Sequence, residues 1–360
     1  MQTSLFTYPE LIELLRRNMP AVLASVIRTQ GSTPQKAGSS ALIGSGQLLA
    51  GTVGGGTTEL KVIQEARAAL QSKKPKLFSF DLHGELSKGS DSICGGSMVV
   101  LLDATPEKHI EVFSRLGKSL EQHIPGVLMT WIDKSNPEKI DINRYWVTRE
   151  KEFFFRGELG LAVDIVISGM LEDPRTLCQT IEVVNPETNS DDLVFLECLI
   201  PKPSLIIAGA GHIGRSLAHL GKFLGFEVTV WDDREEYASK TQIPDADFVW
   251  SGPIDTVLEK MKLSDDSYLV VVTHGHKNDA EVLRKFISKP SAYLGMIGSK
   301  AKVSQMKTEF IAKGWATPEQ WKRIFAPVGL SIGGQTVEEI ALSIAAQLVQ
   351  VRNERNKTGE

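Results

Sequence analysis

The sequence lacks the features that mark several large classes of protein. Among its 360 residues, no apolar run approaches the roughly 18 residues of a membrane helix. The first residues show no charged-then-apolar signal pattern, so we expect a cytosolic protein without a membrane span. Lys and Arg number 40 against 44 Asp and Glu, and the net charge of −4 provides no electrostatic footprint for nucleic acid.

Cysteine is also scarce. Cys94, Cys178 and Cys198 are odd in number and far apart, which argues against a disulfide framework and against a Cys-x-x-Cys metal site. Each is first interpreted as a small buried hydrophobic residue. No internal repeat is visible, and 42% hydrophobic with 23% charged residues is typical of a soluble globular chain. At about 150 residues per domain, this length predicts two domains.

Residues 205–234 contain the pattern around which the rest of the chain is interpreted. An apolar run opens into Gly-x-Gly-x-x-Gly at Gly209, Gly211 and Gly214, and a helical pattern and a second apolar run ending in Asp232 follow. This order is that of a Rossmann dinucleotide-binding unit. The glycines would allow a tight turn, the approach of a pyrophosphate and close helix packing, and Asp232 would hold a ribose diol. Alternatively, the glycines serve packing alone.

Two later loops would face the same crevice. The apolar run 268–273 delivers His274 and His276 to the carboxyl edge of a parallel sheet, where ligands bind in open α/β folds. These histidines could bind a metal, orient a phosphate, act as acid–base groups or be ordinary polar loop residues. Gly298 and Ser299 follow another strand pattern at the start of a helix, which predicts a second phosphate-facing turn.

Secondary structure elsewhere is read from capping signals and apolar runs. Thr7 with Glu10, and Thr336 with Glu339, have the spacing of a capping box at the start of a helix. The apolar run 161–168 is typical of a strand.

The passage into the Rossmann pattern is stiffened by Pro201 and Pro203, so we place a domain boundary near residue 200. The predicted fold class is α/β. An N-terminal α+β domain would cover residues 1–200 and a C-terminal Rossmann-like domain with a parallel sheet residues 201–360.

The N-terminal half carries two further glycine motifs. Gly54, Gly55 and Gly56 precede a helical pattern, where free backbone N–H groups and the helix dipole favour an anion, although a tightly packed turn would explain them equally well. Cys94 precedes two glycines at the start of a strand pattern. Because glycines allow a ligand to approach the backbone closely, we expect the Cys94 thiol to be accessible to such a ligand. A buried, inert cysteine is the alternative.

Taken together, these motifs resemble those of the XdhC/CoxI family, whose proteins are accessory factors for molybdenum hydroxylases such as xanthine dehydrogenase. The resemblance is carried by residues 31–34 (Gly-Ser-Thr-Pro), 51–59, 94–96 (Cys-Gly-Gly), 209–212, 232–234, 273–276, 295–299 and 327–330. It spans both halves of the chain, while residues 105–195 carry no motif of this kind.

The resemblance implies a protein without turnover that binds molybdenum cofactor (molybdopterin), protects it during sulfuration and delivers it to apo-xanthine dehydrogenase or a related hydroxylase. It also implies contact with a cysteine desulfurase and assembly as a homodimer. Cys94 matches the Cys-Gly-Gly motif of the family and would contact the molybdenum centre, for which a soft thiolate is a plausible ligand. The expected cofactor-binding residues are Lys36, Gly54, Gly55, Gly56, Glu59, Cys94, Gly95, Gly96, Gly209, Gly211, His212, Gly214, Asp232, His274, His276, Gly298 and Ser299.

The Rossmann half alone supports a different hypothesis. An NAD(P)-dependent oxidoreductase could use His274 or His276 as its acid–base group. Against this, no substrate-binding arginine or obvious catalytic pair stands out in the N-terminal half.

Overall fold

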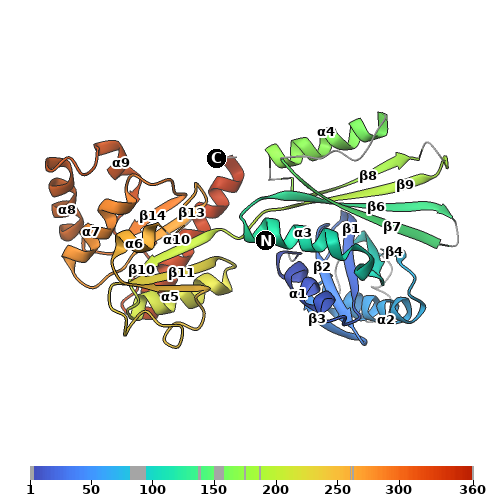
Figure 1. Cartoon of the computed structure of the whole chain (residues 1–360), viewed down its shortest axis with the longest axis horizontal. Coiled ribbons are helices and arrows are strands. Elements are labelled where there is room, and N and C mark those ends of the chain that lie inside the picture. The colour runs from blue at the N-terminus through green and yellow to red at the C-terminus, as the bar shows by residue number, and fades with distance from the viewer. Residues whose placement is uncertain are drawn as a thin grey trace. The chain divides into compact units, whose positions relative to one another are not determined.

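The computed structural model describes residues 4–81, 95–136, 139–149, 158–173, 176–185, 188–259, 261 and 263–358. Contacts divide the chain into two compact units, Met1–Pro201 and Lys202–Glu360, coloured from blue to green and from yellow-green to red in Figure 1. Within the described residues, none of the helices combines the length and apolarity that a span across a membrane requires.

The first unit contains two antiparallel sheets. The strand order is β3-β2-β1-β5-β4 in sheet one and β7-β6-β9-β8 in sheet two. The strands are β1 (Val22–Gly31), β2 (Ser40–Gly44), β3 (Gln47–Gly51), β4 (Lys76–Asp81), β5 (Gly96–Asp103), β6 (Gly126–Asn136), β7 (Lys139–Thr148), β8 (Cys178–Val184) and β9 (Asp191–Leu199). One face of each sheet contributes to a shared core, where Ile27 and Leu101 of sheet one meet Ile132 and Phe195 of sheet two.

Helices complete the layers of this unit (Figure 1). They are α1 (Ser4–Arg16), α2 (Gly56–Ser72), the 3-10 helix η2 (Pro106–His109), α3 (Ile110–Glu121) and α4 (Glu158–Glu172). α2 packs on sheet one through Val62, Ala66 and Ala69, whereas α1 and α3 share a core with strands of both sheets. α4 covers the other face of sheet two.

Two local predictions in this unit are wrong. The run 161–168, predicted as a strand, lies within α4, whose buried Val163, Ile167 and Met170 recur at helical spacing; a short apolar run does not by itself distinguish the two structures. Thr7 lies inside α1 rather than at its cap, and its hydroxyl donates to the carbonyl of Ser40, 3.3 Å away. This tertiary contact competes with the capping role that the spacing indicated.

The second unit is built on a parallel sheet with the order β12-β11-β10-β13-β14-β15, which confirms the predicted α/β fold class with its Rossmann-like domain. Its strands are β10 (Ser204–Ala208), β11 (Glu227–Asp232), β12 (Phe248–Ser251), β13 (Ser267–Val271), β14 (Tyr293–Met296) and β15 (Ile324–Phe325). Because the strand order reverses between β10 and β13, a topological switch point lies at the carboxyl end of β10.

Helices cover both faces of this sheet, as Figure 1 shows. They are α5 (His212–Phe223), α6 (Ile254–Leu258), α7 (His276–Phe286), α8 (Lys300–Ala312), α9 (Pro318–Lys322) and α10 (Val337–Thr358). α5 and α10 share one apolar core with the sheet, and the other four helices share a second. The predicted capping box before α10 is confirmed, because the Glu339 N–H donates to the Thr336 hydroxyl while the Thr336 N–H donates to the Glu339 carboxylate.

Candidate functional site

The turn after β10 gives its three glycines different roles. A Cβ at Gly209, whose φ is +122°, would lie 2.3 Å from the Val272 carbonyl oxygen, and one at Gly214 would lie 1.9 Å from the Gly209 carbonyl oxygen. Packing therefore requires both. A Cβ at Gly211 would meet no heavy atom within 4 Å, so this glycine faces open space. The turn thus leaves room for a ligand at one glycine only.

Gly211 is also the N-cap of α5, and no side chain caps this helix start. The first N–H groups of a helix carry partial positive charge and favour an anion. His212, the first residue of α5, is exposed. This geometry suits the pyrophosphate-binding role predicted for the turn.

Asp232 ends β11 with both carboxylate oxygens occupied. Its Oδ2 accepts hydrogen bonds from the Ala210 N–H (2.8 Å) and from Arg234 Nη2 (3.0 Å). Its Oδ1 accepts from Arg234 Nε (2.8 Å) and from the Arg234 N–H (3.1 Å). Burial alone would raise the pKa of Asp232, but the Arg234 hydrogen bonds and the backbone donors outweigh it, and the pKa lies below its usual value. The residue is therefore a buried carboxylate held by the protein itself.

The loops after β13 and β14 are joined through Asp279, a fully buried residue of α7. Its Oδ1 accepts from the N–H (3.1 Å) and the hydroxyl (2.6 Å) of Thr273, and its Oδ2 lies 2.5 Å from Nζ of Lys302. Lys302 belongs to the first turn of α8, where the Ser299 hydroxyl accepts the Lys302 N–H as the N-cap. The predicted loops containing His274 and Ser299 are therefore neighbours.

His274 reaches back toward the loop after β11. Its Nδ1 lies 3.9 Å from Oδ1 of Asp233, and Nδ2 of Asn278 donates to Oδ2 of Asp233 at 3.4 Å. Ligand atoms of Asp232, Asp233 and His274 lie within 4.8 Å of one another, a spacing that could hold a metal ion. Because Arg234 already neutralises Asp232, this cluster is poorly suited to a second cation. His276 begins α7, and its side chain lies outside the described residues.

In the first unit, backbone packing brings the predicted loops together. Gly31 pairs with Gly96 in the β1–β5 register. A Cβ at Gly31 would lie 2.9 Å from the Gly95 carbonyl oxygen, and one at Gly96 would lie 2.4 Å from the Gln30 carbonyl oxygen. Close approach of two backbones thus requires glycine at both positions.

The same loop reaches the glycine run before α2. A Cβ at Gly54 would lie 2.9 Å from Cγ of Pro34, whereas Gly55 and Gly56 have no heavy atom near theirs. Gly55 is the N-cap of α2, and no side chain caps that helix start. Residues 31–34 therefore lie between the two other N-terminal motifs, beside an open helix start.

The polar residues predicted for this site differ in position. Lys36 is exposed on the loop that follows Pro34. Glu59 folds back instead, and its Oε2 accepts from the Thr52 hydroxyl (2.7 Å) and the Val53 N–H (3.4 Å). Glu59 thus holds the glycine run in shape, a role that the sequence did not separate from ligand binding.

Cys94 lies outside the described residues. The other two thiols remain protonated at neutral pH, because burial raises the pKa of Cys178 and that of Cys198 to about 11. A protonated thiol is a poor nucleophile and metal ligand. Neither Cys178 nor Cys198 therefore offers the thiolate chemistry expected of Cys94.

Two buried polar pairs of the first unit, one between α1 and sheet two and one between the two sheets, had no signal in the sequence. The Tyr8 hydroxyl donates to Glu197 Oε2 at 2.6 Å, and Arg144 Nη1 donates to Asp103 Oδ2. All four residues are buried, and burial raises the pKa of Glu197 to about 7. Tyr8 and Glu197 are 189 residues apart in the chain, and Asp103 and Arg144 are 41 residues apart. No local sequence pattern reveals contacts over such separations.

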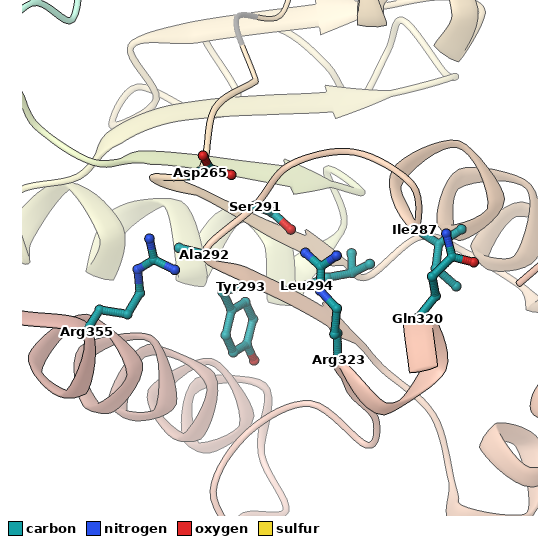
Figure 2. A pocket seen from close by; sticks show the side chains of 9 residues that line it. All are labelled: Asp265, Ile287, Ser291, Ala292, Tyr293, Leu294, Gln320, Arg323 and Arg355. Atoms are coloured by element: carbon teal, nitrogen blue, oxygen red, sulfur yellow. The ribbon is translucent and has the colours of Figure 1, made fainter. Parts of the chain in front are cut away.

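A pocket of about 510 Å³ opens at the opposite, amino edge of the parallel sheet. Figure 2 shows Arg355 of α10 and Arg323 after α9, both beside the start of β14 at Ala292 and Tyr293. None of the predicted site residues lines it. Ligands of open α/β folds bind at the carboxyl edge, so the candidate site remains at the glycine turns.

Sequence models of one family match two regions of the chain. The XdhC and CoxI family matches residues 14–81, and the XdhC Rossmann domain matches residues 205–348. The two regions contain most of the predicted glycine motifs of each unit.

Individual proteins match over nearly the whole chain. The chain is 27% identical to a Bacillus subtilis (strain 168) protein named as a probable xanthine dehydrogenase subunit, covering 94% of this chain and 95% of that protein. It is 25% identical to the uncharacterized protein YqeB of Escherichia coli (strain K12), but spans only 46% of the length of that relative. A crystal structure of a xanthine dehydrogenase from Bacillus halodurans matches with a TM-score of 0.75 and 27% identity, over 97% of this chain and 96% of that one.

Proposed function

The chain belongs to the XdhC and CoxI family, and on this premise we propose that it is an accessory protein of a molybdenum hydroxylase of the xanthine dehydrogenase type. The names of the relatives from B. subtilis and B. halodurans support this association, because both match over nearly their whole length. The E. coli relative is more than twice as long as the matched region and has no assigned role to transfer.

We propose further that the chain binds molybdenum cofactor as cargo, protects it while the terminal sulfur ligand is installed and delivers it to the apo-hydroxylase. The cofactor would supply the hydroxylation chemistry of the client enzyme. In this chain, the open N–H groups at Gly55 and Gly56 would receive the pterin phosphate, and Lys36 would add a positive charge. Cys94 would contact the molybdenum centre through a soft thiolate.

The observation that carries this proposal in the first unit is the packing of residues 31–34. Pro34 adjoins Gly54, while Gly31 adjoins Gly95 and Gly96, so three glycine-containing segments far apart in sequence form one loop cluster. The cluster combines an uncapped helix start with an exposed cation, which is the chemistry that a phosphate-bearing cofactor requires.

The partners proposed with this role are an apo-xanthine dehydrogenase or related hydroxylase, a cysteine desulfurase as the sulfur source and a second copy of the chain in a homodimer. A cytoplasmic location fits such partners.

The second candidate, an NAD(P)-dependent oxidoreductase, is favoured by the open Gly211 turn alone. His274 or His276 would be its acid–base group. Nδ1 of His274 already faces Asp233, and the side chain of His276 lies outside the described residues.

The test is to purify the chain from cells with active molybdenum cofactor synthesis and to measure bound molybdenum by mass spectrometry and bound pterin by fluorescence. We expect near-stoichiometric amounts of both, and restored activity when the loaded protein is mixed with an apo-hydroxylase. Absence of pterin and molybdenum under these conditions would contradict the proposal.

Cys94→Ser should reduce the retained molybdenum about tenfold, as the loss of a group beside a bound metal typically does, without changing the thermal unfolding of the chain. Cys178→Ser is the matched control, because its thiol is protonated at neutral pH and should not bind the metal. Equal retention in the two variants would make Cys94 a packing residue.

A further inference from the structure

The acid of the Rossmann fingerprint has no free oxygen to offer a ribose. A carboxylate accepts about four hydrogen bonds, and Asp232 receives four N–H donors, three from Arg234 and one from Ala210, at 2.8 to 3.1 Å. In sites that bind NAD, this acid accepts a hydrogen bond from the ribose 2′-hydroxyl. Here an incoming diol would have to break a charge-assisted pair to reach it.

Beside Asp232, the guanidinium group of Arg234 is the group available to a ligand. Arg234 lies with Cζ 3.9 Å from the centroid of the Tyr237 ring, and its side chain is 26% exposed. Arg215, from the first turn of α5, has its Cζ 5.8 Å from the same ring, and its Nε donates to the Ala210 carbonyl at 3.1 Å. Two cations thus flank one aromatic ring next to the glycine turn.

Three further acids lie beside Arg234 in the sequence: Glu235 and Glu236 are exposed on the turn that follows it, and Asp233 faces the segment after β13. Asp233 receives a hydrogen bond from Asn278 at 3.4 Å and lies 3.9 Å from His274, both on the segment after β13. It is 4.0 Å from Nε of Arg234, farther than Asp232 is. Nε and Nη2 of Arg234 are already paired with Asp232, and Nε of Arg215 with the Ala210 carbonyl, which leaves Nη1 of Arg234 and the Nη groups of Arg215 for a ligand. Planar guanidinium groups suit phosphate oxygens.

We propose that the Rossmann site of the second unit selects a dinucleotide that carries a phosphate on its adenosine ribose, of the NADP class, over the free diol of NAD. The pyrophosphate would approach the open backbone at Gly211, and the ribose phosphate would pair with Arg234 and Arg215. The inference goes beyond the cofactor-carrier role and does not depend on it, because it rests on residues of the second unit alone.

Isothermal titration of the full chain at about 150 mM salt tests the selectivity with NADP⁺, NAD⁺, adenosine 2′,5′-bisphosphate and 5′-AMP. We expect NADP⁺ to bind at least about tenfold more tightly than NAD⁺, and the bisphosphate more tightly than 5′-AMP by a similar factor. Equal binding within each pair, a preference for NAD⁺, or no binding at millimolar ligand would overturn the proposal.

Arg234→Ala provides the sharper test, because it removes a phosphate partner and frees Asp232 at once. Affinity for NADP⁺ should fall about tenfold while affinity for NAD⁺ rises. A damaged unit would weaken both ligands, so opposite changes exclude misfolding as the cause. Equal losses for the two ligands, or no change for either, would show that Arg234 only holds Asp232 in place.

Two further variants complete the series. Arg215→Ala should weaken NADP⁺ without strengthening NAD⁺, because it frees no carboxylate. Arg284→Ala is the matched control: this arginine also packs on an aromatic ring, with Cζ 5.0 Å from the Trp315 centroid, but it belongs to the last turn of α7, away from the glycine turn. Its selectivity should equal that of the unchanged chain, and an Arg284→Ala effect as large as that of Arg234→Ala would overturn the assignment.

Discussion

Gly55 in the first unit and Gly211 in the second occupy equivalent positions, each as the uncapped N-cap of a helix with open space where a Cβ would lie. Their backbones differ. Gly55 has φ 67° and ψ −179°, a region that is essentially confined to glycine, whereas Gly211 has φ −69° and ψ −171°, which any residue adopts. The fold therefore explains glycine at position 55 but not at position 211. At Gly211, access for a ligand is the remaining physical reason for a missing side chain.

The neighbouring glycines of the two turns extend this contrast. Gly209 and Gly214 are fixed by backbone contacts below 3 Å, and Gly54 by a contact with the Pro34 side chain. A glycine pattern thus mixes residues required by packing, by conformation and by access. Substitution separates the three causes.

The largest effect should come from Gly214→Ala. Its Cβ would lie 1.9 Å from the Gly209 carbonyl oxygen, so α5 must move away from β10, at a cost of about 4 kcal/mol in the free energy of unfolding. Urea unfolding followed by tryptophan fluorescence should show early unfolding of the second unit. A loss below about 1 kcal/mol would show that the turn relaxes easily and would weaken the contrast with Gly211.

The next largest effect concerns pH and should be confined to the first unit. Burial raises the pKa of Glu197 to about 7 from an ordinary 4.5, so the folded state favours the protonated form. The stability that this proton contributes is complete below pH 4.5 and is lost as pH rises through about 7, a total of about 3 kcal/mol.

Glu197→Gln removes this titration while keeping an acceptor for the Tyr8 hydroxyl. Relative to the unchanged chain, the variant should gain about 3 kcal/mol in free energy of unfolding between pH 4.5 and pH 8. Thermal unfolding across this range measures the difference. Parallel pH profiles for the two proteins would mean that Glu197 titrates normally.

The smallest effects test the two cap glycines directly. Gly55→Ala should cost about 2 kcal/mol, because alanine is strained at that backbone conformation, whereas Gly211→Ala should change stability by less than about 0.5 kcal/mol. Gly211→Ala should nevertheless weaken the binding of NADP⁺, since its methyl group occupies the space next to the helix start. Equal stability losses in the two variants would contradict the conclusion that backbone conformation requires glycine at position 55 and ligand access requires it at position 211.

Sequence reasoning predicted the second unit well because its signals are local. Strand, glycines, helix and Asp232 follow one another within about 30 residues, and each has a separate physical role. The strand predicted within α4 is wrong, because a short apolar run does not show whether its apolar residues repeat with the period of a helix or of a strand. The capping box of Thr336 was predicted because both partners lie within one helical turn.

What the sequence could not supply are contacts between distant side chains. The sequence pattern predicts Asp232 as a ribose ligand, and only the orientation of Arg234, two residues on, shows that the carboxylate oxygens of Asp232 are occupied. Asp279 and Lys302 belong to different helices, so their pairing depends on the packing of α7 against α8. The Tyr8–Glu197 contact likewise requires α1 to pack against β9.

The link between Asp279, Thr273 and Lys302 has a consequence for motion. The fully buried carboxylate of Asp279 accepts hydrogen bonds from an amide, a hydroxyl and an ammonium group. These bonds join the segments after β13 and β14 to each other away from solvent. The Thr273 amide should therefore be among the slowly exchanging hydrogens of the unit despite its position in a loop. Amides of the two segments should then exchange at similar rates, because one buried carboxylate holds both.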